Sequence, residues 1–252
     1  MMMALAAMAA PAAAEIHVQA HYRCGEADAI QKQGGTETAP ATKDSSSHGR
    51  DMIHVLGTLT YTRQVAKGAA GSSIALRISE SGTCYSDDVN GFGLEGQKLG
   101  WGIEGWFMSS TANEANGDGT PAEKWFVGIG SPHNRNGMAI AQLGDQFVGI
   151  LNGVTYVEAR PALTVQPGQW IHLALVADAD GNAKLYVNGD LHTTRNAQPG
   201  ALLGKDAAHI GVRPGGDAKL KDGAVDEVRI FTFEGMFDPR DLLINQAESQ
   251  TH

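Results

Sequence analysis

Two acidic residues, Asp226 and Glu227, stand side by side in the stretch KDGAVDEVRIF, which otherwise has the composition of a β-strand. Asp and Glu are poor strand formers, and a carboxylate on the buried face of a sheet needs a hydrogen-bond donor, a cation or a metal. Such a pair could supply the two acids of a glycoside hydrolase, bind a metal ion, or be solvated charges at the edge of a sheet.

The alternation of side chains along a strand separates the two acids. Adjacent residues of a strand point to opposite faces, whereas a retaining glycosidase needs two carboxyl groups about 5–5.5 Å apart. Asp226 shares its expected face with Val228 and Ile230, and Glu227 shares its face with Arg229. Because neither face holds a second acid, the stretch does not predict a catalytic pair.

The two carboxylates therefore receive different predictions. We expect Glu227 to form a surface ion pair with Arg229, a contact worth at most about 1 kcal/mol. We expect Asp226 to lie on the core side of the strand, where it needs a partner. A bound cation and hydrogen bonds from backbone or hydroxyl groups satisfy a buried acid equally well, so the residues alone leave both alternatives open.

The rest of the chain contains no other recognisable catalytic motif. The G-x-S-x-G, P-loop and H-E-x-x-H patterns are absent, and the cysteines and histidines lack zinc-ligand spacing. His172, close to Trp170 in a predicted strand, is expected to pack rather than act as a base. A formal charge of −9 and the lack of a Lys/Arg-rich run argue against nucleic-acid binding. The sequence predicts that the protein is not an enzyme.

Short strands are the elements that must position these residues. Apolar alternation places Trp101, Ile103 and Phe107 on one face of a strand. Further strands recur at the 8–12-residue spacing of a sandwich, and Asn188-Gly189 predicts a type I′ hairpin turn. The only helix-like piece is 238–249. The fold class predicted is all-β, an antiparallel β-sandwich with a short C-terminal helical turn.

The N-terminal segment 1–14 differs from the rest of the chain. It is Ala-rich and apolar, ends in small residues and is too short to span a bilayer, as in a secretory signal, although it lacks a charged beginning. The alternative is a disordered or loosely helical Ala-rich tail. With the signal, we expect a secreted or cell-envelope protein whose residues 15–252 form a single domain.

Six stretches together resemble the laminin-G-like jelly rolls of the concanavalin A-like lectin/glucanase superfamily. They are HYRCGEAD, DSSSHGRD, GWGIEGWF, GQWIHLALVADADGNAKLYVNGDL, AHIGVR and GAVDEVRIF. The resemblance implies two curved antiparallel sheets, secretion, and binding of a glycan or an extracellular protein. It commonly implies a structural calcium, with Asp44 and Asp226 as candidate ligands and carbonyl groups near Glu26 and His48. The chain departs from its relatives in DSSSHGRD, where they typically have Gly and Asn in place of Ser47 and His48.

Cys24 and Cys84 are the only cysteines. In an exported protein a single pair is a candidate disulfide, and the resemblance favours it because the two positions would be neighbours in the fold. The alternative is two small buried hydrophobic residues.

Ligand binding is expected on loops held by the rigid sandwich. The candidates are Glu114, Asn116 and Asp118 in one loop, His133, Asn134 and Arg135 in the next connection, and Trp125 as an aromatic platform for a sugar. The alternative is ordinary polar loops and a core tryptophan. Together these expectations describe a non-catalytic binding module for a glycan or an adhesive contact. A structural or protein-interaction domain of the cell envelope or matrix is the alternative, and a divergent glycoside hydrolase is the remaining one.

Overall fold

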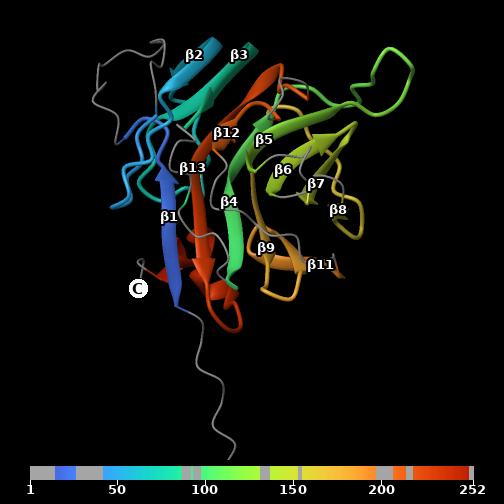
Figure 1. The fold of residues 1–252 in the computed structure, drawn as a ribbon. Coiled ribbons are helices and arrows are strands. Elements are labelled where there is room, and N and C mark those ends of the chain that lie inside the picture. Colours follow the sequence, from blue (N-terminus) through green and yellow to red (C-terminus); the bar gives the residue numbers. More distant parts are fainter. Residues whose placement is uncertain are drawn as a thin grey trace, which may run out of the picture.

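The structure is a computed structural model of the chain, shown in Figure 1. It describes residues 15–26, 42–86, 92, 98–130, 137–152, 155–196, 207–213 and 218–249. The N-terminal segment 1–14 lies outside the described residues. No helix among the described residues is long and apolar enough to cross a membrane.

The described strands form one continuous antiparallel path that folds over itself into two layers (Figure 1). The order is β11-β10-β9-β4-β13-β3-β12-β5-β6-β7-β8, with β1 added to β13 and β2 added to β3. β6 packs against β4 and β9, and β8 packs against β10 and β11, although none of these pairs shares a ladder. The predicted antiparallel sandwich is confirmed.

The strand bounds are β1 Ile16–Tyr22, β2 His54–Thr62, β3 Ala75–Tyr85, β4 Gly100–Ser109, β5 Glu123–Ile129, β6 Met138–Leu143, β7 Gln146–Leu151, β8 Thr155–Glu158, β9 Ile171–Ala177, β10 Asn182–Val187, β11 Asp190–Asn196, β12 Ala208–Ile210 and β13 Asp222–Phe233. A 3₁₀ turn, η2 (Pro239–Asp241), and a helix, α1 (Leu243–Ser249), follow β13, as predicted for the C-terminus. Asn188 and Gly189, which join β10 to β11, both have positive φ angles, as a type I′ turn requires.

Alternation along β4 divides its side chains between two buried surfaces. Trp101, Ile103 and Phe107 belong to the core between the layers, as predicted. The opposite, outer face is also buried, because Phe231 and Phe233 of β13 lay their rings across it. A Cβ added to Gly102 would lie 2.1 Å from the Phe231 ring, and one on Gly100 would lie 2.3 Å from the Phe233 ring. The glycines of the GWG motif therefore make room for the phenylalanines of the FTF motif.

The C-terminal segment covers this outer face and is held by a buried charge network. Phe237 stacks on Phe231 with ring centroids 5.6 Å apart. Glu104, on the outer face of β4, accepts a hydrogen bond from Arg229 Nε at 2.6 Å and from the backbone N–H of Leu243 at 2.9 Å. It also contacts Nε2 of His172 at 3.1 Å, and both side chains are fully buried. The outer face is therefore a second packed layer.

Arg229 is thus not the partner that the sequence predicted for Glu227. It pairs with Glu104, and it also donates a hydrogen bond to the carbonyl of Asp241 at 2.5 Å. Burial disfavours the charged form of Glu104, but the charge of Arg229 and the hydrogen bond from His172 outweigh it and hold the pKa of Glu104 below its ordinary value. The expectation that His172 packs in the interior is met.

The predicted disulfide is not formed. Cys24 and Cys84 are both buried, and no disulfide joins them. The thiol of Cys84 lies 3.5 Å from Sδ of Met52, and the thiol of Cys24 lies 3.4 Å from the carbonyl oxygen of Tyr22. The alternative is correct: each cysteine fills a small space in the core.

The contact between Gly102 and Phe231 generates a stability prediction. Gly102→Ala should lower the free energy of unfolding by about 2 kcal/mol, because the Phe231 ring is confined by Phe237 and by the guanidinium of Arg229 5.3 Å from its centroid. Urea denaturation would measure the change. Gly117→Ala is the matched control, since a Cβ at Gly117 meets nothing within 4 Å. Equal effects of the two substitutions would contradict the close packing of the Phe231 ring on Gly102.

Candidate functional site on strand β13

Strand β13 carries a one-residue bulge at the acid pair. Asp226 pairs with Trp106 of β4, and the next regular partners are Arg229 and Glu104, so three steps on β13 match two on β4. Glu227 lies within the bulge and has a φ of +46°. Gly105 lies opposite, where a Cβ would be 3.2 Å from Cα of Val228. The bulge therefore depends on a glycine in the neighbouring strand.

The bulge reverses the predicted faces. Val225, Val228 and Ile230 all belong to the core between the layers. Asp226 instead lies beside Trp106, on the outer face of the sheet, although it is fully buried there. The prediction that Asp226 shares the core-side face with Val228 is wrong, because the extra residue restarts the alternation after position 226.

Asp226 has only one of its oxygens satisfied by the described residues. Oδ2 accepts a hydrogen bond from Oγ of Ser72 at 2.6 Å. Oδ1 is buried and has no hydrogen-bond partner. Burial, aided by the nearby carboxylates Glu227 and Glu26, raises the pKa of Asp226 to about 8, and the hydrogen bond from Ser72 opposes this shift. The environment therefore lacks a positive charge to match this carboxylate.

Glu26, which follows β1, faces the same point. Its Oε1 accepts hydrogen bonds from the backbone N–H of Ser73 at 2.5 Å and of Ile74 at 2.7 Å. Its Oε2 is buried without a partner. One oxygen each from Glu26, Asp226 and Glu227 all lie within 4.8 Å of one another. Three carboxylates from distant parts of the chain thus converge on one small volume.

Glu227 contacts the basic side chains of the site. Its side chain is 7% exposed, accepts a hydrogen bond from Arg23 Nε at 3.0 Å and contacts His21 Nε2 at 2.7 Å. Both partners lie on or just after β1, the neighbour of β13 (Figure 1). The predicted surface pair with Arg229 is therefore wrong, because the bulge turns Glu227 toward β1. Arg23 and His21 both contact Glu227, whereas the described residues give Asp226 and Glu26 no cationic partner.

The donor set fits a hard divalent cation. Calcium is bound by six to eight oxygens, mostly from carboxylates, carbonyls and water. The cluster offers three carboxylates, two of which have a buried oxygen without a partner among the described residues. Neither a thiol nor an imidazole belongs to this group of described residues, which disfavours zinc. Glu26, Asp226 and Glu227 are the residues that would hold the ion.

Two residues predicted for this site lie outside the cluster. The Asp44 carboxylate accepts hydrogen bonds from the backbone N–H groups of His21, Ser46 and Arg50 at 2.8–2.9 Å. It fastens its own loop to β1 and is not one of the converging acids. His48 is exposed on that loop. Glu26 and Asp226 therefore lie near one another, whereas Asp44 and His48 are not part of this cluster, and calcium binding by any of these residues stays a prediction.

The described loop residues that were predicted to bind a ligand are engaged with neighbouring lysine and threonine side chains. Glu114 pairs with Lys124 and, at 3.2 Å, with Lys221, which contributes to a pKa of about 2. Burial acts against this lowering, but the hydrogen bonds from Lys124 and Thr111 outweigh it. The loop continues into Asn116 and Asp118, whose side chains both bond Thr120. His133, Asn134 and Arg135 lie outside the described residues, so their part in binding stays a prediction.

Trp125 is not an open platform. It is 2% exposed, and its Nε1 donates to Oε1 of Glu123 at 2.8 Å. The same carboxylate accepts hydrogen bonds from the hydroxyl of Tyr156 at 2.5 Å and from Arg213 at 3.2 Å. Trp125 therefore belongs to a packed layer on the outer side of β5, as the alternative interpretation held.

A family model for the concanavalin A-like lectin/glucanases superfamily matches residues 100–234, more than half of the 252 residues. The chain belongs to this superfamily. No curated protein matches the chain.

Solved structures share the fold of this concanavalin A-like chain at low sequence identity. Domain 4 of AbnA, a GH43 extracellular arabinanase from Geobacillus stearothermophilus, solved in complex with arabinotriose, is similar over 92% of this chain and 98% of its own, with a TM-score of 0.56 and 17% identity. The botulinum neurotoxin serotype G binding domain is similar over 93% of this chain, with a TM-score of 0.54 and 12% identity. A botulinum neurotoxin type C structure, described as dependent on two ganglioside molecules for cell entry, is similar over 86%, with a TM-score of 0.53 and 12% identity. The chain spans 51% and 52% of those two toxin chains.

The lectin/glucanase superfamily contains catalysts, so access to the clustered acids matters. Glycoside hydrolysis requires two carboxyl groups flanking a bound sugar. In this concanavalin A-like chain Asp226 is fully buried and Glu227 is 6% exposed. Ser72, His21 and Arg23 occupy the hydrogen-bonding positions around them. A sugar ring cannot stand between these acids, and the cluster suits an ion instead.

The raised pKa of Asp226 makes a prediction for protein freed of metal by a chelator. In the folded protein Asp226 keeps its proton up to about pH 8, whereas in the unfolded chain it releases this proton near its ordinary pKa of 3.8. The stabilising effect is therefore complete below the unfolded pKa and is lost as pH rises toward the folded one. The free energy of unfolding should fall between these values, by up to about 1.4 kcal/mol per pH unit.

Chemical denaturation of Asp226→Asn across pH 5–8 checks this, because the amide cannot ionise and should flatten the profile. Asp222→Asn is the matched control, since Asp222 lies on the same strand and is 38% exposed beside Arg77. A profile in Asp226→Asn as steep as that of the parent would show that Asp226 does not carry this proton.

Proposed function

We propose that the chain is a non-catalytic binding module for a glycan, stabilised by calcium at Glu26, Asp226 and Glu227. The observation that carries the proposal is the burial of the acid cluster, which suits ion binding and denies a sugar access to the carboxylates. Support for a glycan comes from the superfamily and from similar structures, whose titles name arabinotriose for the AbnA domain and gangliosides for the type C neurotoxin. The low identity of these structures supports the fold, and their ligands are extended to this chain as part of the proposal.

Calcium would act on stability rather than on catalysis. An ion at the cluster would bind the carboxylates of Glu26, Asp226 and Glu227 and would join β1, β13 and the segment around Ser72 and Ile74. β1 and β13 already share a ladder, whereas the segment around Ser72 and Ile74 is joined to the site by hydrogen bonds to Asp226 and Glu26. We also propose that the module acts outside the cell, because the Ala-rich segment 1–14 has the composition of a secretory signal.

Calcium binding predicts a shift in thermal stability. A ligand that binds only the folded state stabilises it by about 2.7 kcal/mol at 100 times its Kd, so millimolar calcium should raise the Tm of chelator-treated protein by roughly 5–10 °C. Asp226→Asn and Glu26→Gln should each lose most of this shift, because each removes a carboxylate that faces the ion. Glu114→Gln, which changes an acid in a distant loop, is the control and should keep it. An unchanged Tm in calcium would rule the ion out.

The choice between binding and catalysis predicts the outcome of two assays on one preparation. On a glycan array in calcium, the protein should retain at least one glycan. Incubated with that glycan, it should release no reducing sugar above the buffer blank, because no described acid pair flanks an open sugar site. Release proportional to protein would overturn the non-catalytic assignment. Capture of a protein partner with no glycan bound would favour the structural or protein-interaction alternative.

A further inference from the structure

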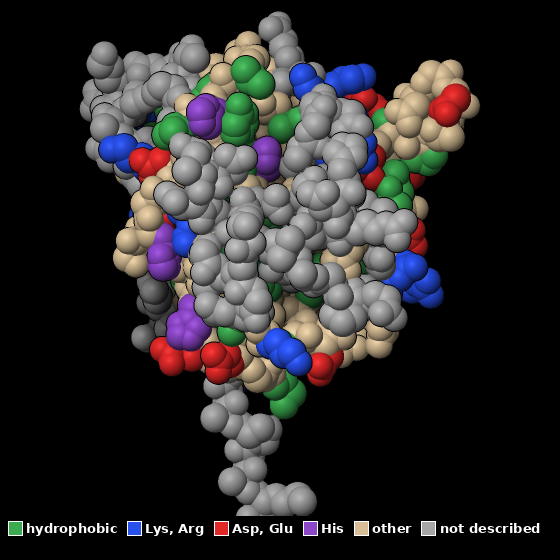
Figure 2. Space-filling view, in the orientation of Figure 1, with side chains coloured by type: hydrophobic (Ala, Val, Ile, Leu, Met, Phe, Trp, Pro, Cys, Tyr) green, Lys and Arg blue, Asp and Glu red, His purple; other side chains and the backbone are tan. Residues whose placement is uncertain are grey.

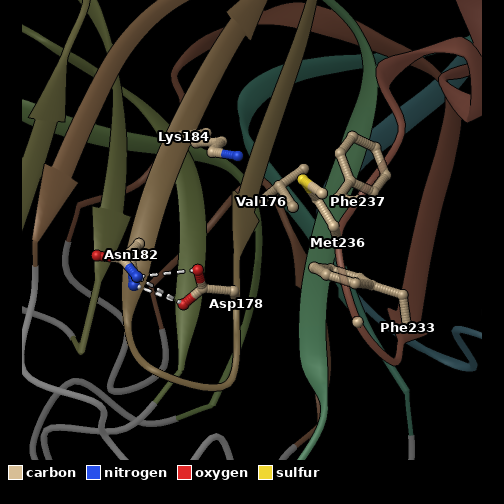
Figure 3. A pocket seen from close by; sticks show the side chains of 8 residues that line it. Val176, Asp178, Asn182, Lys184, Phe233, Met236 and Phe237 are labelled. Atoms are coloured by element: carbon tan, nitrogen blue, oxygen red, sulfur yellow. Dashed lines mark hydrogen bonds between the residues drawn. The ribbon is translucent and has the colours of Figure 1, made fainter. Parts of the chain in front are cut away.

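A groove lies at the end of the outer face, between the β9–β10 hairpin and the turn that follows β13 (Figure 3). Its volume is about 240 Å³, and one wall is polar while the other is apolar. On the face of the molecule shown in Figure 2, the described charged side chains of both signs lie around the margin of the view. The lining of the groove contains one carboxylate, Asp178, and one ammonium group, Lys184, so the groove is distinguished by its mixed lining rather than by strong charge.

The polar wall offers both donors and acceptors. Asp178 accepts hydrogen bonds from the backbone N–H of Asn182 at 2.8 Å and from its side-chain amide at 3.0 Å, which fixes both side chains. Lys184 lies opposite Val176 across the ladder and directs its ammonium group toward the apolar wall (Figure 3). The described residues provide no ion-pair partner for this ammonium group. The wall thus combines a carboxylate, an amide and an available ammonium group.

The apolar wall comes from the end of β13 and the turn after it. Phe233 and Phe237 are almost fully buried and form its base. Met236 is 60% exposed and stands at the rim (Figure 3). Gly235 has a φ of +78°, and a Cβ there would meet nothing within 4 Å, so the turn leaves the groove open. An exposed thioether beside fixed polar groups is a surface that suits a ligand with one apolar side.

A second hollow continues the groove past Phe233 and Gly235. It has a volume of about 490 Å³ and is lined also by Lys98, Glu234 and Ala179. The first hollow is smaller than the roughly 300–1,000 Å³ of a typical small-molecule site, so it fits a single ring of a ligand. The second hollow is open to the next unit of a chain-like ligand. Each hollow has one cation and one acid in its lining, so neither selects for a charged ligand.

We propose that this groove binds the end of a neutral oligosaccharide, with the terminal sugar between Lys184 and Met236. Sugar hydroxyls need both donors and acceptors, which the polar wall supplies, and the carbon-bound face of the ring packs on the thioether and the phenylalanines. A net charge of −9 disfavours acidic glycans at a site without excess positive charge. The inference rests on the proposed glycan binding and adds the location and the class of sugar.

The groove is separate from the acid cluster. Six residues of β13 lie between Asp226 and Phe233, which corresponds to roughly 20 Å along a strand. Calcium at the cluster would therefore not contact the sugar. A failure of calcium binding and a failure of sugar binding can be distinguished in experiments on the same variants.

The experiment titrates protein carrying ¹³C-methyl methionine with cellotriose, maltotriose, xylotriose and trigalacturonate in calcium. At least one neutral trisaccharide should shift the Met236 methyl signal, which Met236→Leu identifies. Lys184→Met should lower the affinity for it about tenfold, because a hydrogen bond to a charged group is lost. Met236→Ala should lower it severalfold. Lys67→Met and Leu56→Ala, two exposed positions away from the groove, should bind within about twofold of the parent.

Each other outcome has a definite meaning. Binding of a neutral trisaccharide that Lys184→Met and Met236→Ala leave unchanged would overturn the groove as the site and would leave the proposed function standing. Binding of trigalacturonate alone would overturn the neutral class of ligand. Binding of none of these sugars, together with an empty glycan array, would overturn the proposed function and the groove together. Thermal melts of each variant exclude loss of fold as the cause, and the methyl shift is observed in the parent protein, with Met236→Leu used only to assign the signal.

Discussion

One extra residue in the middle of β13 determines how the rest of the outer layer is built. Without the bulge at Glu227, strict alternation would place Arg229 and Glu227 on one face and Asp226 with Ile230 on the other. With it, Asp226 stays on the outer face, Glu227 turns to His21 and Arg23, and Arg229 also returns to the outer face. Acid residues that alternation would keep apart are thereby brought within 4.8 Å of each other.

The return of Arg229 to the outer face fixes the C-terminal segment. Glu104 lies on the neighbouring strand and is fully buried, so it requires the charge of Arg229 and the hydrogen bonds from His172 and Leu243. Removing one partner of a buried ion pair typically costs about 3–5 kcal/mol, since a charge is left unpaired in the interior. The bulge, the ion pair of Arg229 with Glu104, and the C-terminal segment that covers the outer face therefore depend on one another. The acid cluster lies at one edge of this unit.

The sequence was sufficient for the fold because the fold is built from local signals. Alternating Trp101, Ile103 and Phe107, and the Asn188-Gly189 turn, specify strands and hairpins whatever the distant chain does. The site was predicted only in part. Alternation gives the wrong face for Asp226 because the bulge depends on Gly105 of another strand, which becomes a neighbour only after folding. The adjacent acids and the opposing glycine were the available signals, but neither alone indicates an inserted residue.

The other partners of the acid cluster could not be inferred for a similar reason. Ser72 and Ile74 reach it from a loop whose sequence has no distinctive pattern, and the contact spans more than 150 residues in the case of Ser72. The groove at the end of the sheet is equally non-local. Asp178 looks like an ordinary turn residue in sequence, and its role depends on where the segment after β13 stops covering the sheet.

The point at which the segment after β13 stops covering the sheet decides where a ligand can bind. Along β4 the outer face is filled in turn by the Phe233 ring over Gly100, the Phe231 ring over Gly102, and Arg229 against Glu104. Phe237 extends this cover to Tyr186 on β10. Val176 of β9 is still buried against these phenylalanines, but beyond it Asp178, Asn182 and Lys184 line a groove. Packing closes the centre of the outer face, where its strongest charges lie, to a sugar. A ligand can therefore bind only at the margin of this face, where the charges are balanced and an apolar wall faces a polar one.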